Sequence, residues 1–425
     1  MASAAEQLAA NVNWSAFGKA EELKKRIWFT LGAVIVYRLG AYIPLPGVNS
    51  VAFEQSFLAQ RQGALDVFNM FSGGAVQRMS VFALSVVPYI SAAILIQLLG
   101  LVVPQLAETK DGGALRRKAI SQYKRYLTVI LAMIQAYGVA IALEGRAGIV
   151  ADPGALFRIS TVVGLTGGAT LLFWLVEQIA SRGLGNGWSL ILFAGIVAQL
   201  PHAFVQLFEL GRQGSVSTVV VLGVLVMVVA IVAFIVFMER THRRVPITYP
   251  RRQVGNKVYE GQSSFLPLKL NTAGILSPVV AASLVLLLTT VTNLSSPIYL
   301  ALYAVLIVFF AFFYTWNVFN SVETAETLKK NGGFIPGVRP GERTAQYMDQ
   351  ILTRISALGA AYLTLVCLLP EWLISYSGLP PYFGGTAILI VISVTMDTIG
   401  QIHGYLQAQQ YEGLINRTKS RGRKK

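Results

Sequence analysis

The stretch from Gly63 to Pro104 reads GALDVFNMFSGGAVQRMSVFALSVVPYISAAILIQLLGLVVP. It begins with a short amphipathic segment, Ala64 to Phe71, and is then broken by the pair Gly73-Gly74. No charge occurs from Met79 to Ala107, and about 20 apolar residues are enough to cross a bilayer. A helix broken by glycines leaves backbone groups unbonded, which a water-filled cavity tolerates and lipid does not. The pattern predicts a membrane span preceded either by a broken-helix plug of a channel or transporter, or by an ordinary external loop with one helical turn.

The composition predicts the class of protein. Of 425 residues, 54% are hydrophobic and 13% are charged, whereas soluble domains carry about 25% charged residues. We therefore expect an all-α integral membrane protein. The single cysteine, Cys367, excludes an intramolecular disulfide framework and a cysteine-based metal cluster. Because no nucleotide-binding loop, metal-ligand pattern or hydrolase motif occurs, we expect no catalytic site, no metal and no cofactor.

Apolar segments separated by charged or turn-forming residues predict ten transmembrane helices, preceded by a surface helix from Trp14 to Lys25. The segments are Ile27–Ile43, Met79–Val103, Tyr126–Leu143, Ile159–Val176, Trp188–Phe208, Val216–Met238, two in the charge-free stretch Leu270–Val322 divided at Asn293–Pro297, Ile355–Pro370 and Gly384–His403.

The loops between these segments are alternately basic and nearly uncharged. The basic ones are Lys110–Arg125, Arg240–Lys269, Lys329–Arg354 and the tail Arg417–Lys425. Lysine and arginine are retained on the cytoplasmic side of membranes. This pattern predicts a multi-pass protein with both termini in the cytoplasm.

Two of the predicted cytoplasmic loops, residues 239–269 and 321–354, are far longer than a helical hairpin needs. In the first, Ile247–Tyr249 and Lys257–Tyr259 are expected to pair as a small hairpin. In the second, Arg339 lies between two Pro-Gly pairs, which predicts a rigid tip that displays one guanidinium. Such basic surfaces suit a polyanionic partner. The alternative is that retention of positive charge and anionic lipid account for the charges.

Polar residues inside the predicted spans are sparse. Arg38 lies near mid-membrane, and Asp397 lies in the cytoplasmic half of the last span. A transporter would use such residues as a substrate or coupling-ion site. Since no acidic cluster accompanies them and the three histidines are scattered, a structural role against neighbouring helices is the favoured interpretation.

Seven motifs stand in order along the chain and carry a resemblance. They are FNMFSGGA (Phe68–Ala75), PYISA (Pro88–Ala92), RRKAISQY (Arg116–Tyr123), RGLGNGWS (Arg182–Ser189), LPLKLNTAG (Leu266–Gly274), FIPGVRPGE (Phe334–Glu342) and YFGGT (Tyr382–Thr386). From about Leu23 to Tyr411 the chain resembles the SecY family, the channel subunits of the bacterial general protein translocase.

The resemblance implies a fold of two five-helix halves, residues 1–208 and 209–425, related by a pseudo-two-fold axis around a central pore. Residues 64–74 would form the half-helix plug of that pore, with the site residues Leu65, Asp66, Val67, Phe68, Asn69, Met70, Phe71, Ser72 and Gly73. The pore ring would be Val86, Ile90, Trp188, Leu192, Val279 and Ile390. Trp188 departs from the aliphatic residue usual there, which puts its place in the ring in doubt. The plug is short, mildly polar and tethered by glycines, so we expect it to be weakly packed and easily displaced.

The resemblance also implies partners and a location in the inner (cytoplasmic) membrane of a bacterium. The partners would be SecE and SecG-like small subunits, the SecA ATPase, ribosomes contacted through their RNA, signal peptides and preproteins, and the lipid bilayer. Docking of SecA or the ribosome would use Arg243, Arg244, Arg251, Arg252, Lys257 and Arg339. In the first loop, Gly255-Asn256-Lys257 stands where many relatives carry two basic residues, which weakens the case for tight ribosomal contact. A lateral gate would include Ser91, Gln97, Gln135, Asn271 and Ala282.

Three functions remain open on the residues. The first is a protein-conducting channel that moves unfolded secretory chains outward and releases apolar helices into lipid. The second is a secondary transporter, which would need a polar site at mid-membrane. The third is an insertase or scaffold that never opens a full pore. The resemblance favours the first, in which the channel is passive and energy comes from SecA, translation or the membrane potential.

Overall fold

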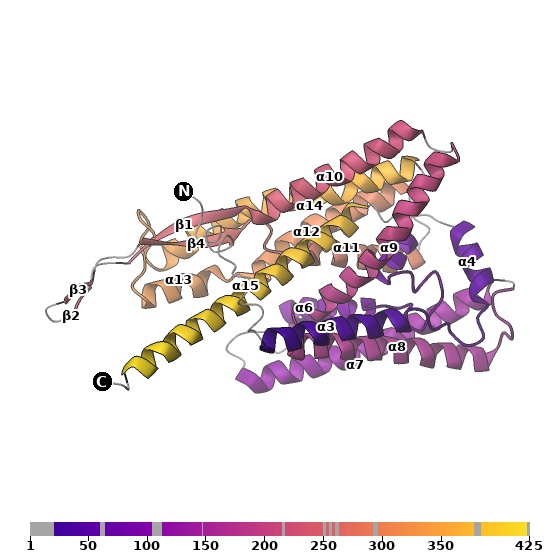
Figure 1. The fold of residues 1–425 in the computed structure, drawn as a ribbon, viewed down its shortest axis with the longest axis horizontal. Helices are drawn as coiled ribbons and strands as arrows, with labels where there is room; N and C mark the ends of the chain where they lie inside the picture. Colours follow the sequence, from indigo (N-terminus) through magenta and orange to yellow (C-terminus); the bar gives the residue numbers. More distant parts are fainter. Residues whose placement is uncertain are drawn as a thin grey trace. The chain divides into compact units, whose positions relative to one another are not determined.

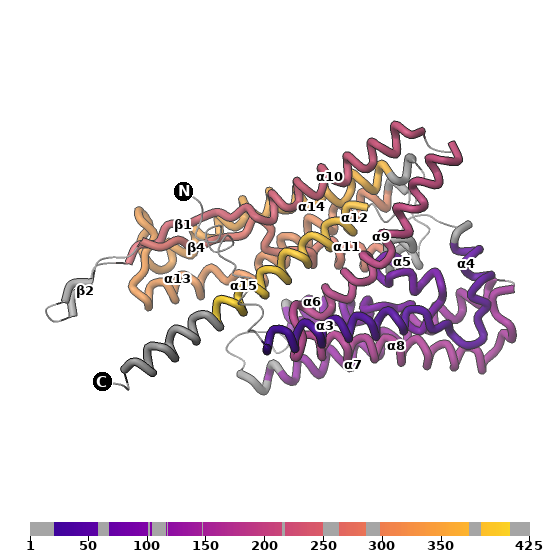
Figure 2. The backbone as a smooth tube through the Cα atoms, in the orientation of Figure 1, coloured from indigo at the N-terminus to yellow at the C-terminus, as the bar shows by residue number. Residues whose placement is uncertain are grey.

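A computed structural model describes residues 21–59, 64–103, 113–146, 148–214, 217–249, 252–254, 257–259, 263–291, 296–377 and 384–422, and Figure 2 traces the backbone. The surface helix expected from Trp14 lies largely outside these residues. The chain forms two compact units. Unit 1 comprises Met1–Gln62, Phe68–Pro201 and Val394–Lys425, and unit 2 comprises Gly63–Val67 and His202–Ser393.

Long apolar helices dominate both units (Figure 1). Among the described residues, seven helices are long and apolar enough to cross a membrane, and Val87–Gly100 and Leu276–Val285 are shorter apolar helices. The seven are Lys118–Glu144, Ala155–Arg182, Gly187–Arg212, Thr218–Arg240, Ile298–Lys330, Glu342–Leu373 and Gly385–Ala408. The expectation of a multi-pass, helical membrane protein is confirmed.

Unit 1 is built from helices packed around an apolar core. Its elements are α3 (Glu21–Gly40), α4 (Ser50–Ala59), α5 (Ala64–Phe71) from Phe68 on, α6 (Val87–Val102), α7 (Gly113–Glu144), α8 (Ala155–Arg182), α9 (Gly187–Arg212) up to Pro201, and α15 (Gly385–Gly422) from Val394 on. Helix α7 packs against α6 and α8, and α8 also packs against α3. The core between them includes Leu45, Phe53, Met79, Leu165 and Ala169.

The second predicted span is wrong at its start. Sequence analysis begins it at Met79, but α6 begins only at Val87 and has 16 residues, a length of about 24 Å. The preceding turns pass through positive φ at Met79 and Ser85. Their backbone groups are satisfied by the chain after α3, because Leu45 N donates to the Met79 carbonyl (3.0 Å) and Val81 N donates to the Ile43 carbonyl (3.0 Å). The absence of charge indicated burial here and not a helix.

The basic loop before the third span is also different from expectation. Helix α7 begins at Gly113 and has 32 residues, so the cluster Arg116–Lys118 and the pair Lys124-Arg125 belong to the helix. Arginine and lysine are good helix formers, so the helix continues beyond its apolar part. Arg125 is paired with Glu177 of α8 at 2.9 Å.

Unit 2 contains the remaining described helices and the four strands found among the described residues. Its elements are α10 (Thr218–Arg240), β1 (His242–Thr248), β2 (Arg252–Val254), β3 (Lys257–Tyr259), β4 (Ser263–Lys269), α11 (Leu276–Val291), α12 (Ser296–Val318), α13 (Ser321–Lys330), α14 (Glu342–Ser377) and the ends of α9 and α15 that lie within it. The charge-free stretch is divided between Val291 and Ser296, which confirms two helices there. Helix α12 packs against both α11 and α14.

The strands form two antiparallel pairs, β1 with β4 and β2 with β3. The expected partner of Ile247–Tyr249 is wrong: Ile247 pairs with Ser264, whereas Lys257 pairs with Val254. Strands β2 and β3 form the small hairpin, and the longer pair is formed by β1 and β4. The β1–β4 register buries Val245 and Ile247 on one face while Arg244 and Pro246 are exposed, and burial of one face specifies the register of a strand pair.

Candidate functional site

The predicted plug is a helix of 8 residues, α5, that ends at the glycine pair. Gly73 and Gly74 have φ of 66° and 83°, a conformation that favours glycine. The predicted break is therefore confirmed. The side chains of Leu65, Asp66 and Val67 lie outside the described residues. The side chains that follow are described: Phe68 is half-buried, and Asn69, Met70, Phe71 and Ser72 are buried.

Side chains from other helices donate hydrogen bonds to the backbone carbonyls at the carboxyl end of this segment. The Tyr37 hydroxyl donates to the Ser72 carbonyl at 3.0 Å. The Gly73 carbonyl accepts from Arg38 Nη1 at 3.0 Å and from Gln199 Nε2 at 2.8 Å. The Ser72 carbonyl also accepts from Ala75 N at 3.4 Å, whereas the side chains of Arg38 and Gln199 supply the partners of the Gly73 carbonyl. We call these five residues the carbonyl latch; it joins α5 to α3 and α9.

A second set of polar contacts holds the last turn of α5. Asn69 Oδ1 accepts from the backbone amide of Gln77 at 2.9 Å, and Asn69 Nδ2 donates to Gln77 Oε1 at 3.3 Å. Gln77 Nε2 in turn donates to Glu54 Oε1 of α4 at 2.6 Å. The turn after α5 is thus tied to α4 as well as to α3 and α9.

Helix α9 approaches the latch closely at Gly195. A Cβ atom added there would lie 3.0 Å from the Tyr37 hydroxyl oxygen, 3.1 Å from the Gly73 nitrogen and 3.1 Å from the Phe71 carbonyl oxygen. These contacts would be tight for any side chain, so the close approach favours glycine. The expectation of a weakly packed segment is therefore wrong for Asn69 to Gly73, because an apolar and glycine-rich sequence does not reveal backbone hydrogen bonds to distant side chains.

The two polar residues singled out inside the spans have different environments. Arg38 is half-buried, binds Gly73 and lies over the Tyr42 ring, 5.4 Å from its centroid. Arg78 lies over the same ring at 4.2 Å. Asp397 is exposed on α15. Arg38 thus makes structural contacts with neighbouring segments.

The six residues of the predicted pore ring are distributed over both units. In unit 1, Val86 and Ile90 lie at the start of α6, Leu192 lies in the second turn of α9, and all three are buried. Trp188, in the first turn of α9, is half-buried. Val279 on α11 and Ile390 on α15 are fully buried in unit 2. The ring itself stays a prediction.

The predicted gate residues are likewise distributed over both units. In unit 1, Ser91 is buried on α6, whereas Gln97 on α6 and Gln135 on α7 are half-buried. In unit 2, Ala282 is buried on α11, and Asn271 is buried in the turn before it. The Asn271 amide bonds to protein groups through both its nitrogen and its oxygen.

The two large loops of unit 2 form one structure, which sequence analysis missed. Thr248 of β1 and Phe334 of the second loop exchange backbone hydrogen bonds of 2.9 and 3.0 Å. Below this bridge, a common core contains Val245, Leu268, Ile335, Met348, Leu352 and Ile355. We call residues 242–269 and 319–355 the loop domain; Figure 1 shows α13 beside the β1–β4 ribbon. The alternation of Val245 and Ile247 with Arg244, Pro246 and Thr248 is the sequence signal that could have indicated a core.

Three of the six predicted docking residues, Arg243, Arg244 and Arg339, have described side chains, and all three are exposed. Arg243 and Arg244 are exposed on β1, and the Arg244 guanidinium lies 5.6 Å from the centroid of the Phe265 ring. Arg339 is exposed, and its carbonyl accepts from Thr344 Oγ1 at 3.0 Å. The backbones of Arg252 and Lys257 lie in β2 and β3, and Arg251 lies outside the described residues.

The tip that carries Arg339 has the geometry its sequence predicts. Gly337 and Gly341 have φ of 83° and 106°. Each of these glycines follows a proline, so positive φ alternates with fixed φ on both sides of Arg339.

A model of the SecY family matches residues 80–399.

The chain belongs to the SecY family. It is 45% identical over 430 residues to the protein translocase subunit SecY of Escherichia coli K12, an alignment that covers 96% of this chain and 97% of the relative. It is 44% identical over 419 residues to the corresponding subunit of Rickettsia conorii, with 94% and 97% covered. As a member of the SecY family, the chain functions in protein translocation.

Solved structures share the SecY fold. A structure described as a protein conducting channel has a TM-score of 0.66 at 15% identity and covers 91% of this chain and 93% of its own. The Sec61 channel from a canine ribosome–channel complex has a TM-score of 0.61 at 14% identity, with 91% and 93% covered.

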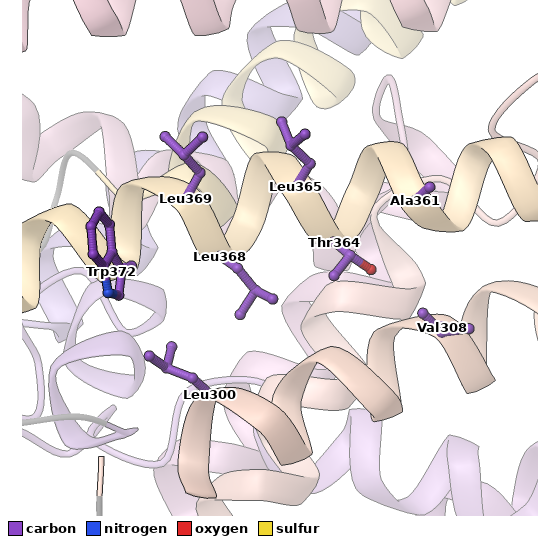
Figure 3. A pocket seen from close by; sticks show the side chains of 8 residues that line it. All are labelled: Leu300, Val308, Ala361, Thr364, Leu365, Leu368, Leu369 and Trp372. Atoms are coloured by element: carbon purple, nitrogen blue, oxygen red, sulfur yellow. The ribbon is translucent and has the colours of Figure 1, made fainter. Parts of the chain in front are cut away.

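Unit 2 also carries an apolar pocket between α12 and α14 (Figure 3). Leu300 and Val308 of α12 face Leu368 and Thr364 of α14, and Trp372 closes one end. The lining has one hydroxyl and no charge, so it offers contact to hydrocarbon and no means of selecting a polar solute.

Proposed function

We propose that this chain is the channel-forming subunit of a bacterial protein translocase. It moves unfolded secretory proteins across the cytoplasmic membrane and releases transmembrane helices sideways into the bilayer. The observation that carries the proposal is the half-helix α5, which ends at the Gly73-Gly74 break and is held by the carbonyl latch. A short helix of this kind suits a plug that closes a water-filled funnel.

The architecture of this channel has ten transmembrane helices in two pseudo-symmetric halves, residues 1–208 and 209–425. Support comes from the seven long apolar helices, to which α3, α6 and α11 add three that are shorter or more polar. Both termini are cytoplasmic, because the basic loop domain and the basic tail then lie on the same side.

The gate of the channel is a ring of bulky apolar side chains. Val86, Ile90, Leu192, Val279 and Ile390 narrow the pore until it loses water, which blocks ions while still allowing a passing chain to push the side chains apart. Trp188 borders this ring. Their deep burial supports the role, as does their placement on α6, α9, α11 and α15.

The lateral exit of this channel lies between α6 and α11. Ser91 and Gln97 lie on α6, Gln135 lies on the adjoining α7, and Ala282 lies on α11. An apolar segment in the pore is stabilised by lipid once these helices separate. Asn271 acts at this exit through the turn that begins α11.

Partners bind at the loop domain on the cytoplasmic face. SecA or the ribosome docks on Arg339 and the β1–β4 ribbon, where Arg243, Arg244 and Arg339 are exposed. Among the solved relatives, the idle yeast Ssh1 complex is bound to the 80S ribosome. SecE and a SecG-like subunit accompany the channel. The channel is passive and carries no catalytic site, so energy comes from SecA, translation or the membrane potential.

A disulfide lock tests the proposal. The paired substitutions Ser91→Cys and Ala282→Cys, in a Cys367→Ala background, are introduced into the complex and oxidised. We expect the locked channel to stop both preprotein export and helix insertion, and reduction to restore both. The single-cysteine variants serve as controls. A locked channel that inserts helices at the normal rate would move the exit elsewhere, and failure of SecE to co-purify would argue against the translocase assignment.

A further inference from the structure

The base of the β1–β4 ribbon meets two helices at one point. The last backbone bond at this base runs from Leu270 N to the Thr241 carbonyl at 3.2 Å. Glu239 precedes Thr241 by two residues and lies at the end of α10, and Asn271 follows Leu270 and precedes α11. Asn271 Nδ2 donates to Glu239 Oε1 at 2.7 Å. The side-chain bond therefore continues the ribbon into the helices.

Asn271 also sets the start of α11. Its Oδ1 atom accepts from the backbone amide of Gly274 at 2.9 Å, and Gly274 adopts a φ of 60°. Helix α11 begins two residues later, at Leu276. One buried amide thus fixes the turn that aims the helix and ties this turn to α10.

A third element meets the same carboxylate. Ser393 Oγ of α15 lies 3.5 Å from Glu239 Oε1, so α10, α11 and α15 converge there within unit 2. One carboxyl oxygen, Glu239 Oε1, is thus shared by the Asn271 amide and the Ser393 hydroxyl. The seven paired residues of β1 and β4 form a stiff extension of this point, and their outer end is bridged to Phe334 near the Arg339 tip.

We propose that the Glu239–Asn271 pair is the joint through which a partner bound on the loop domain repositions α11, the helix that carries Val279 and Ala282. Asn271 is thus a positioning residue for the gate. This inference rests on the proposed docking function of the loop domain. A displacement of the ribbon reaches α11 through Asn271 because the turn from Asn271 to Gly274 is closed by the same side chain.

The test removes the bond without removing the turn. In Asn271→Ser the hydroxyl can still accept from the Gly274 amide, as serine does in such turns, but it is too short to reach Glu239. We expect the affinity of purified SecA for the reconstituted complex to be unchanged. At saturating SecA, ATP-driven preprotein import into vesicles should fall about tenfold, the effect of losing one hydrogen bond.

A second measurement separates transmission from folding. Amide hydrogen exchange of residues 275–285 should change when SecA binds the wild-type complex. In Asn271→Ser the exchange of the idle complex should equal that of the wild type, and the SecA-induced change should be absent. The double variant Asn271→Asp with Glu239→Gln reverses the donor and acceptor, so it should recover both import and the exchange response. Thr272→Val is the matched control, because the Thr272 hydroxyl bonds only to the Lys269 carbonyl (3.1 Å), in the same turn.

Each alternative outcome has one meaning. Normal import and a normal exchange response in Asn271→Ser would overturn the joint and leave the channel function standing. A loss of SecA affinity in that variant would also overturn it, since Asn271 would then belong to the docking surface. If SecA failed to bind the wild-type complex, the docking proposal would fall, and the joint with it.

Discussion

Arg38 and Gly73 are joined by a 3.0 Å hydrogen bond from the guanidinium to the backbone carbonyl. The bond places a cation at the carboxyl end of the predicted plug, where helix carbonyls carry partial negative charge. Gln199 binds the same carbonyl oxygen from α9. To leave this position the segment must exchange three hydrogen bonds, two of them buried, for bonds to water, so the latch opposes displacement.

Loss of the latch should favour the unplugged state. We expect Arg38→Leu and Gln199→Leu each to weaken the hold on Gly73, by about 1 kcal/mol for the neutral bond and up to about 3 kcal/mol for the charged one. Since 1.4 kcal/mol is a factor of about ten, the open probability of the idle channel in a planar bilayer should rise several-fold to a hundredfold. Tyr42→Phe is the control, because it removes only the 3.4 Å contact of Arg38 and leaves the bond to Gly73. If all three variants had the same idle-channel conductance, the latch would not contribute to sealing the channel.

A single methyl group on α9 should act in the same direction. Gly195→Ala puts a Cβ atom 3.0–3.1 Å from three atoms of the latch region, so we expect the latch contacts to be displaced and weakened. We expect more frequent idle-channel openings and increased export of a precursor with a defective signal sequence. Gly138→Ala on α7 has no atom within 4 Å of the new methyl group and should leave both quantities unchanged.

A polar residue in the predicted ring should bias the gate. Ile390→Asn buries an amide without a partner in the apolar ring, which favours the wetted state by about 1–3 kcal/mol. We expect higher conductance and relaxed discrimination against defective signal sequences. Leu389→Asn introduces the same amide at the neighbouring, fully buried position outside the ring. If both variants lowered stability alike but neither altered conductance, Ile390 would be a packing residue.

Charge reversal at the tip should separate docking from folding. Arg339→Glu places like charge against an acidic partner surface, at a cost of a few kcal/mol. We expect SecA-driven export into vesicles to be lost while the complex assembles normally. Co-translational insertion should suffer less, because the first loop offers ribosomal RNA further cations. Lys330→Glu makes the same change of charge on α13 in the same domain, and its export should remain near normal.

The shared core should hold both loops at once. Ile335 is buried in the core of the loop domain, so Ile335→Ala should lower its local stability by about 2–5 kcal/mol. We expect protease to cleave both the first and the second loop faster, while the membrane helices stay intact. Val322→Ala, at an exposed position on α13, should change neither rate. Faster cleavage of the second loop alone would contradict a common core.

Much of this fold follows from simple signals in the sequence. Charge-free runs indicate the spans, the Gly73-Gly74 pair indicates the end of α5, and the Pro-Gly pairs around Arg339 indicate a fixed tip. Each signal is local, because hydropathy and proline or glycine conformation act within a few residues.

The remainder depends on contacts between distant segments. The turns before Val87 are as apolar as a helix, and only their bonds to the chain after α3 distinguish them. In the same way, the sequence around Gly73 does not indicate that Arg38 and Gln199 bind its carbonyl. The sequence around Thr248 does not indicate its pairing with Phe334. Such features are set by tertiary packing, which local patterns do not contain.

The bridge between Thr248 and Phe334 affects how the choice of cytoplasmic partner can evolve. Because each loop supplies one strand of the bridge and part of the same core, neither can change shape without a matching change in the other. A hybrid that receives one loop from a relative would combine two loops that evolved in different proteins. Exchange of both loops as a single cassette should transfer the choice of cytoplasmic partner between species while the pore keeps its own selectivity.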